Sequence, residues 1–339
     1  MATARQDSDD LDTLEAERAR ITEVLVSQAQ DSLEGPAGLL GEAMAYVLSS
    51  PGKLLRPLLM LEACRAGGGD PAAAFPAALG TEYGHVASLV HDDIIDGDSE
   101  RHGKPALHER YDVPTGILAG DLLIFQTFLM FTHCAASGVD SDRVVTAIQV
   151  LSKTCIEMCQ GQALEAAISG DLTTSEQTYL DMIRLKTASF CRAAAFIGAH
   201  LGGADQDATD ALGAYGDYLG MSFQIVDDLL SYVGNTRIVG KSLRSDMDNR
   251  RVTLPVIYAL EAGRMPVRQQ IVEMFAAEPA LHTHRQLAGL LAATRALDRA
   301  RATAYRYTQK AKDQLDRLPF SPSRERLRSL ADVCLQRDH

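Results

Sequence analysis

Acidic side chains cluster in the first third of the chain, in the stretch LVHDDIIDGD. Asp92 and Asp96 are four positions apart, so on a helix their carboxylates leave the same face, one turn from each other. Two such carboxylates repel each other unless a cation lies between them, and their hard oxygen ligands suit Mg²⁺. The cluster also contains Asp93 and follows the apolar residues VASLV. We therefore expect it at the end of a buried helix, as a magnesium site rather than a solvated acidic surface.

A second pair of acids, Asp227 and Asp228, lies in FQIVDDLLSYVG. On a helix, Gln224 and Ser231 share a face with this pair, and apolar residues recur at spacings of three and four over residues 212–230. Acidic residues at the end of a helix with such an apolar stripe indicate that their side chains line a cavity. The pattern is less specific than the first, because its fifth position holds Ser231 instead of a third acid.

Basic side chains accompany both clusters, in motifs such as PGKLLRP, ERHGKP and VGKSLRSD. Taken singly, a lysine or an arginine is most often a surface charge. Taken together, carboxylate pairs and cations around one cavity suit a diphosphate that is bridged by metal ions. The basic residues that could line such a cavity are Lys53, Arg56, Arg101, Lys186 and Lys241.

The elements that would position these residues are helices. No proline occurs between Pro114 and Pro255, a stretch rich in Ala, Leu, Met and Gln. Asp70-Pro71 and Ser321-Pro322 each place a capping side chain before a first-turn proline, and residues 173–176 fit a capping box. Alternating runs typical of strands are scarce. The sequence predicts an all-α fold, a single large helical bundle of ten or more helices around a central cavity.

The length of 339 residues could hold two domains, but no linker-like stretch divides the chain. We expect a polar, disordered tail over residues 1–12 and a single domain over residues 13–339. The formal net charge of −12 argues against nucleic-acid binding, which needs a cationic surface. The sequence shows neither a signal peptide nor an uncharged apolar run that could span a bilayer. We therefore expect a cytoplasmic protein without a stable membrane anchor.

Motifs in the same order along nearly the whole chain resemble those of the trans-isoprenyl diphosphate synthases, the polyprenyl synthetase family. The resemblance begins with GKLLRP at 52–57 and includes EYGHVASLVHDDIID at 82–96 and FQIVDDLL at 223–230. The other matching blocks are HGKP at 102–105, AGDLLIFQTF at 119–128, GQALE at 161–165, KTAS at 186–189, GKSLRSDM at 240–247 and VTLPVIYAL at 252–260.

The resemblance implies a magnesium-dependent prenyltransferase with an isoprenoid synthase-like fold. In such an enzyme, metal ions and basic side chains stabilise the diphosphate that leaves an allylic substrate. The double bond of isopentenyl diphosphate attacks the allylic cation, and loss of a proton gives a longer linear (E)-prenyl diphosphate. The family also implies a homodimer and three Mg²⁺ ions in each active site when the substrate is bound.

The roles that the resemblance implies fall on three sets of residues. The magnesium ligands would be Asp92, Asp96 and Asp227, with Asp93 and Asp228 in supporting positions; together with Lys186 these form the expected catalytic set. The residues that would hold the allylic diphosphate are Arg101, Lys186, Thr187, Gln224 and Lys241. The residues that would hold the diphosphate of isopentenyl diphosphate are Lys53, Arg56, His85 and His102.

Small residues precede the first acidic cluster by one and two helical turns, at Gly84, Ala87 and Ser88. They would line the pocket for the growing tail. In the family, bulky aromatic residues at positions 87 or 88 stop growth early. Small residues here predict a product of twenty carbons or more, although Tyr83 on a neighbouring face could narrow the pocket.

Departures from the family pattern leave other functions open. Ser231 stands where a third aspartate is usual, and His102 stands where the second of two arginines is usual. Both favour a terpene cyclase or diphosphate lyase of the same fold, whereas Lys53, Arg56 and His85 favour the synthase. A third interpretation is a non-catalytic partner subunit, and the intact first acidic cluster argues against it.

Overall fold

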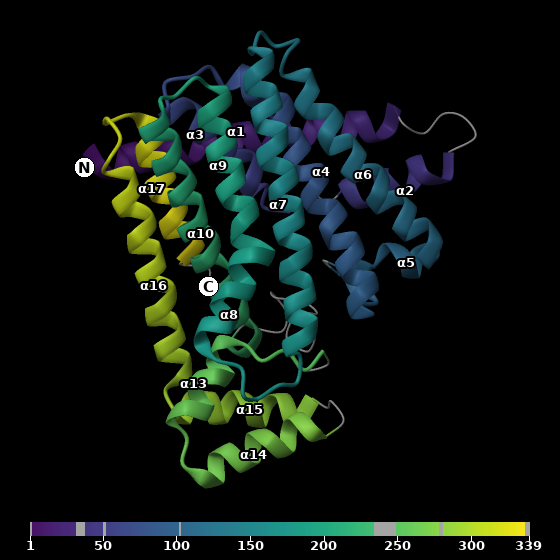
Figure 1. Cartoon of the computed structure of the whole chain (residues 1–339), viewed down its shortest axis with the longest axis vertical. Coiled ribbons are helices and arrows are strands. Elements are labelled where there is room, and N and C mark those ends of the chain that lie inside the picture. Colours follow the sequence, from purple (N-terminus) through teal and green to yellow (C-terminus); the bar gives the residue numbers. More distant parts are fainter. Residues whose placement is uncertain are drawn as a thin grey trace. The chain divides into compact units, whose positions relative to one another are not determined.

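The computed structural model describes residues 2–31, 38–49, 52–101, 103–233, 249–277 and 281–335. Nearly all of these residues belong to helices or the turns between them (Figure 1). The sheet found among them is a two-stranded antiparallel hairpin of β1 (Glu100–Arg101) and β2 (Lys104–Pro105). The predicted all-α fold with ten or more helices is confirmed.

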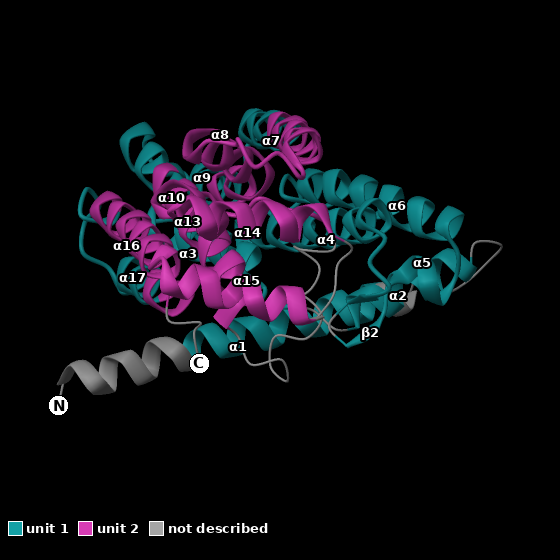
Figure 2. Ribbon diagram, turned by 90° about the horizontal axis from the view of Figure 1, so that it is seen from below, with its two compact units in different colours: residues 1–152, 193–213, 315–329 teal, residues 153–192, 214–314, 330–339 magenta. Residues whose placement is uncertain are grey.

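The chain forms two compact units, each assembled from separate segments (Figure 2). Unit 1 contains residues 1–152, 193–213 and 315–329, and unit 2 contains residues 153–192, 214–314 and 330–339. The predicted tail at residues 1–12 lies outside the residues whose side chains the structure describes. That prediction and the prediction of a single domain over residues 13–339 stay predictions.

Unit 1 is built on a pair of long helices, α4 (Pro71–Asp96) and α6 (Val113–His133), that pack along each other. Helix α3 (Leu55–Ala66) packs on α4 and is almost entirely buried. The remaining helices that contribute to unit 1 are α1 (Ala2–Asp31), α2 (Gly38–Leu48), α5 (Leu107–Arg110), the start of α7 (Ser141–Ile168), most of α9 (Ser189–Leu201), the start of α10 (Gln206–Val233) and the start of α17 (Pro322–Leu335).

Unit 2 surrounds the second half of α10, whose apolar side chains lie in a large buried cluster with Tyr179 and Tyr258. Leu212, Tyr215, Leu219 and Val226 are each at most 2% exposed, in agreement with the apolar spacing over residues 212–230. The other elements of unit 2 are the end of α7, α8 (Glu176–Ile183), the π-helical turn η1 (Arg184–Ala188), the start of α9, α13 (Leu254–Ala262), α14 (Met265–Ala276), α15 (Leu281–Ala293), α16 (Ala296–Leu315) and the end of α17.

The predicted start of α4 is confirmed. The Asp70 side chain accepts a hydrogen bond from the Ala72 backbone N at 2.9 Å, and Pro71 occupies the first turn. Such a cap satisfies one of the backbone donors that a helix leaves unpaired at its start. It fixes the first residue of the helix that carries the first acidic cluster at its other end.

The capping box predicted over residues 173–176 is wrong. Helix α8 begins at Glu176, and Ser175 is its cap, because Ser175 Oγ accepts a hydrogen bond from the Thr178 backbone N at 3.1 Å. Thr173 instead donates its backbone N–H and its hydroxyl to Asp171, at 2.9 and 2.6 Å. An aspartate turn therefore competes for Thr173, and the next serine starts the helix.

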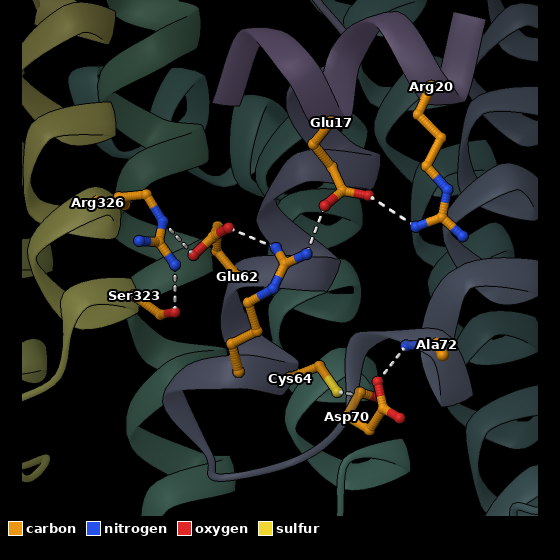
Figure 3. Close-up of polar contacts among 9 residues, drawn as sticks. Glu17, Arg20, Glu62, Cys64, Asp70, Ala72, Ser323 and Arg326 are labelled. Carbon is orange, nitrogen blue, oxygen red and sulfur yellow. Dashed lines mark hydrogen bonds and ion pairs between the residues drawn. The ribbon is translucent and has the colours of Figure 1, made fainter. Parts of the chain in front are cut away.

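A buried ion network connects three helices of unit 1. Glu62 on α3 accepts hydrogen bonds from Arg326 Nε on α17 at 2.9 Å and from Arg65 Nη1 at 2.6 Å (Figure 3). Arg65 also binds Glu17 on α1. Glu62 is almost fully buried, so the two arginines take the place of water around its carboxylate.

Candidate active site

The first acidic cluster lies in the last turns of α4, which ends at Gly97 in the left-handed conformation with a φ of 66°. The C-terminus of a helix carries partial negative charge, so carboxylates there raise the energy of the helix unless cations offset them. Asp93 is buried, whereas Asp92 and Asp96 are partly buried. The two carboxylates at helical spacing are therefore the ones that solvent or a ligand can reach.

Asp93 has a cationic partner in the hairpin that follows the helix. Arg101 Nε donates to Asp93 Oδ1 at 3.0 Å and to Oδ2 at 3.3 Å, and Arg101 Nη2 also binds Oδ1. Arg101 stands in β1, directly opposite Lys104 of β2. The hairpin thus fixes Arg101 against the end of α4 and leaves Nη1 as the donor not used by Asp93.

Lys53 and Arg56 flank the start of α3. Leu54, the residue before the helix, has the left-handed conformation with a φ of 53°, which is uncommon for a side chain of this kind. Arg56 is buried in the first turn, and Lys53 is exposed. A helix N-terminus with two cations is a favourable place for an anion. His85, partly buried, lies on α4, the helix that packs against α3.

In unit 2, Lys186 and Thr187 lie within the π-helical turn η1. Such turns are rare and often mark functional sites. Lys186 Nζ pairs with Glu165 Oε2 of α7 at 2.5 Å, and Arg251 Nε lies 3.7 Å from Glu165 Oε1. Glu165 therefore holds Lys186 in one place, with 17% of the lysine side chain exposed.

Hydrogen bonds in unit 2 connect η1 to the second acidic cluster. Thr187 Oγ1 donates to Gln224 Oε1 at 2.9 Å, and Gln224 Nε2 donates to Asp228 Oδ1 at 2.8 Å. The Tyr179 hydroxyl donates to Asp228 Oδ2 at 2.6 Å. Both oxygens of the buried Asp228 are thus engaged, while Asp227 is partly buried.

The two acidic clusters share one arrangement. In each, the second of two adjacent aspartates is buried and held by protein donors, and the first is more exposed. Within the described residues, no group of three or more His, Cys, Asp or Glu side chains converges on a point. This donor set fits Mg²⁺, which is usually held by one or two carboxylates together with substrate phosphates rather than by an all-protein cage.

Glycines allow helices to approach η1 closely. A Cβ atom on Gly161 of α7 would lie 2.3 Å from the Lys186 backbone N, and one on Gly220 of α10 would lie 2.6 Å from Ala188 Cα. Neither position accepts a side chain without a shift of the backbone. The position of Lys186 therefore depends on Gly161, which stands in the GQALE motif.

The residues predicted to line the tail pocket all lie on α4. Ala87 is buried, and Gly84 and Ser88 are partly buried. The Tyr83 hydroxyl donates to Gln28 of α1 at 2.5 Å, which fixes that ring to α1. One turn before Gly84 on α4, a Cβ on Gly80 would lie 3.0 Å from Phe131 of α6, so the two helices are in close contact there.

Two groups of predicted site residues are in contact within the described part of the chain, one in each unit. Asp93 joins Arg101 in unit 1, and Thr187, Gln224 and Asp228 join one another in unit 2. His102 and Lys241 lie outside the described residues.

Glu165 and Tyr179 also belong to the candidate site, although the sequence patterns do not predict them. Glu165 is the last residue of the GQALE motif, and its charge is the signal that could identify it. Tyr179 stands alone in the sequence and gives no signal of its contact with Asp228.

Comparisons with known proteins match most of the chain. A family model described as "Polyprenyl synthetase" matches residues 37–288. A short chain isoprenyl diphosphate synthase from Methanothermobacter thermautotrophicus is 35% identical over 299 residues, 88% of this chain and 90% of the relative. A geranylgeranyl diphosphate synthase from Methanosarcina mazei is 35% identical over 300 residues, with coverage of 88% and 90%. The solved structure of a polyprenyl synthase from Caulobacter crescentus, complexed with calcium and isoprenyl diphosphate, has a TM-score of 0.88 at 29% identity and covers 97% of each chain.

Proposed function

The chain belongs to the polyprenyl synthetase family, and we propose that it is a trans-prenyltransferase. It condenses isopentenyl diphosphate with an allylic diphosphate and releases a longer linear (E)-prenyl diphosphate of twenty carbons or more. The observation that carries the proposal is the matched arrangement of the two acidic clusters, each with an anchored aspartate and an accessible one. A relative that makes geranylgeranyl diphosphate supports the product class.

Charge stabilisation is the main task of the residues that face the allylic substrate. The bond between the allylic carbon and the diphosphate oxygen breaks, and both electrons leave with the diphosphate. Lys186, fixed by Glu165, and Arg101, fixed by Asp93, donate to the oxygens on which negative charge accumulates. Within unit 2, Thr187 and Gln224 are held by their shared hydrogen bond, and Thr187 directly follows Lys186.

Magnesium is the implied cofactor. When bound, it would neutralise the diphosphate and make it a better leaving group. Asp92 and Asp96 would hold it from α4, and Asp227 would hold it from α10. Asp93 and Asp228 would act through their hydrogen bonds, which fix the ends of the two helices.

The second substrate, isopentenyl diphosphate, would bind at the N-terminus of α3. Lys53 and Arg56 supply positive charge there, and His85 supplies a ring nitrogen from α4. The double bond of the bound substrate attacks the allylic cation and forms the new carbon–carbon bond. The proton that is then lost passes to the released diphosphate.

Replacing Gly161 with alanine is expected to lower kcat/KM for the allylic substrate by about 10²-fold. The new Cβ would collide with the backbone of Lys186, and displacement of a charge-stabilising group by about 1 Å has an effect of that size. Gly289→Ala on α15 is the matched control, because nothing lies within 4 Å of its Cβ position. Steady-state kinetics of both variants decide the matter: equal rates would show that Lys186 does not depend on Gly161.

Replacing Ala87 with phenylalanine is expected to shorten the main product by one or more isoprene units, because the ring would fill space that the growing tail needs. Ser88→Phe, at a partly buried neighbour, should act in the same direction. Ala72→Phe, on the exposed start of α4, is the control. Mass spectrometry of the products checks this. An unchanged product length in both pocket variants would show that the tail grows elsewhere.

A homodimer is the assembly that we propose, and α6 supplies the supporting surface. Large apolar side chains between 44% and 70% exposed lie along α6: Val113, Ile117, Leu118, Phe125 and Leu129. Such a surface favours association with a partner. By length and composition alone, α6 could also cross a membrane, and it is the one helix among the described residues of which this is true. Of its most apolar stretch, 39% is buried inside the protein. We propose a cytoplasmic enzyme, and sedimentation of the full chain tests the dimer.

Incubation with isopentenyl diphosphate and each of four allylic primers tests the function. The primers are dimethylallyl, geranyl, farnesyl and geranylgeranyl diphosphate. We expect isopentenyl diphosphate to be consumed and longer diphosphates to form. Release of diphosphate with hydrocarbon or alcohol products, and with no consumption of isopentenyl diphosphate, would instead identify a cyclase or lyase. Ser231, which is buried at the place of the usual third aspartate, would then be part of the reason.

A further inference from the structure

Glu82 is a buried carboxyl group in unit 1 for which the proposed mechanism has no use. It lies on α4 with 2% of its surface exposed. Its Oε2 atom is buried and has no hydrogen-bond partner among the described residues. Burying an acceptor without a donor costs free energy, and few such groups persist in native proteins. Glu82 therefore calls for a role beyond packing.

Positive charge reaches Glu82 from α3. The described group whose charge acts on the Glu82 carboxyl is Arg56, in the buried first turn of α3. His85 follows Glu82 by three positions on α4 and so shares its helix face, and Lys53 directly precedes α3. Glu82 thus lies beside the residues proposed to bind the diphosphate of isopentenyl diphosphate.

The charge of Glu82 is finely balanced. Burial raises the pKa of its carboxyl to about 7, and the positive charge of Arg56 opposes that rise. An anion bound at Arg56 adds negative charge at the same place, which raises the pKa of a carboxyl further. A carboxylate beside Arg56 would also repel the anion, whereas a neutral carboxyl would not.

We infer that Glu82 takes up a proton from solvent when a diphosphate binds at Lys53, Arg56 and His85. One O–H bond forms, the carboxylate becomes neutral, and the charge of Arg56 then acts on the substrate alone. Glu82 is therefore a positioning residue: it loses its negative charge when the negatively charged ligand binds. The identity of the ligand as isopentenyl diphosphate rests on the proposed function.

Calorimetric titration of the full chain with isopentenyl diphosphate measures this proton. At about pH 8, in two buffers with different ionisation enthalpies, the wild-type chain should take up close to one proton for each ligand bound. Its affinity should fall by up to about tenfold per pH unit above pH 7, because the bound state holds more protons. Glu82→Gln resembles the neutral carboxyl, so it should show no uptake and the smaller pH dependence of the substrate itself.

Glu82 and His85 are both groups on α4 that could accept the proton, and the variant His85→Asn shows which of them does so. Uptake should persist in this variant. Uptake that persists in Glu82→Gln, or that is absent from the wild-type chain, would overturn the inference. If Glu82→Gln fails to fold, infrared difference spectra of the wild-type chain replace it. Binding should then produce the carbonyl absorption of a newly protonated carboxyl, and its absence would be equally decisive.

A product assay of the wild-type chain accompanies these titrations. An enzyme that extends primers but shows no uptake at Glu82 refutes this inference alone. An enzyme that consumes no isopentenyl diphosphate refutes the proposed function first.

Discussion

Asp92→Asn is expected to lower kcat for prenyl transfer by about 10²–10³-fold, the scale of losing one preorganised group that stabilises transition-state charge. The amide keeps the size of the side chain but is a poorer ligand for a hard cation, so the magnesium concentration for half-maximal rate should rise. Helix α4 should remain folded, because the change removes a negative charge from its C-terminal end. Initial rates of isopentenyl diphosphate incorporation over a magnesium series measure both effects.

Asp142→Asn is the matched control for this variant. Asp142 is an exposed acid in the first turn of α7, and we assign it no role in the site. Its variant should keep the wild-type rate and the wild-type magnesium requirement. If the Asp92 variant behaved in the same way, Asp92 would not be a metal ligand and the first acidic cluster would lose its assigned role.

Glu62→Gln is expected to lower the free energy of unfolding by about 3–5 kcal/mol, the usual cost of removing one partner from a buried ion pair. Glu62 binds both Arg65 and Arg326 and is almost fully buried, so the neutral amide removes the negative charge that these two arginines share, and Arg65 keeps only its ion pair with Glu17 within the described part of the chain (Figure 3). The effect should spread to α17, because Arg326 is the contact from that helix to Glu62. Urea unfolding followed by circular dichroism measures the change.

Glu15→Gln provides the comparison. Glu15 pairs with Arg18 at 3.4 Å, but its side chain is 71% exposed. Exposed pairs contribute little, so this variant should change stability by less than about 0.5 kcal/mol. Equal stabilities of the two variants would show that the network around Glu62 does not hold the helices of unit 1 together.

Local patterns in the sequence predict the helical fold and the helical spacing of the two partly buried aspartates in the first acidic cluster. The cap at Asp70 and the helical spacing of Asp92 and Asp96 need only near neighbours, and both appear in the structure as expected. The capping box at residues 173–176 failed because Asp171 and Ser175 offered a better local arrangement. Where two local signals compete, the sequence alone does not choose between them.

Contacts between residues that are far apart in the sequence could not be predicted from local sequence patterns. Tyr179 and Asp228 are 49 positions apart, and Glu62 and Arg326 are 264 positions apart. The π-helical turn at Lys186 also has no pattern of its own, since it occurs where Gly161 and Gly220 admit neighbouring backbones. The sequence therefore indicates which residues could act on a diphosphate. Packing decides which of them are held in place.

The most direct test of the central claim is the product that the full chain forms from farnesyl diphosphate and isopentenyl diphosphate, with Mg²⁺ and with a chelator. We expect mass spectrometry to show prenyl diphosphates of twenty carbons or more in the presence of Mg²⁺. We expect none with the chelator, and recovery when Mg²⁺ is restored in excess. Equal product with and without the metal, or no extended diphosphate under either condition, would contradict the account.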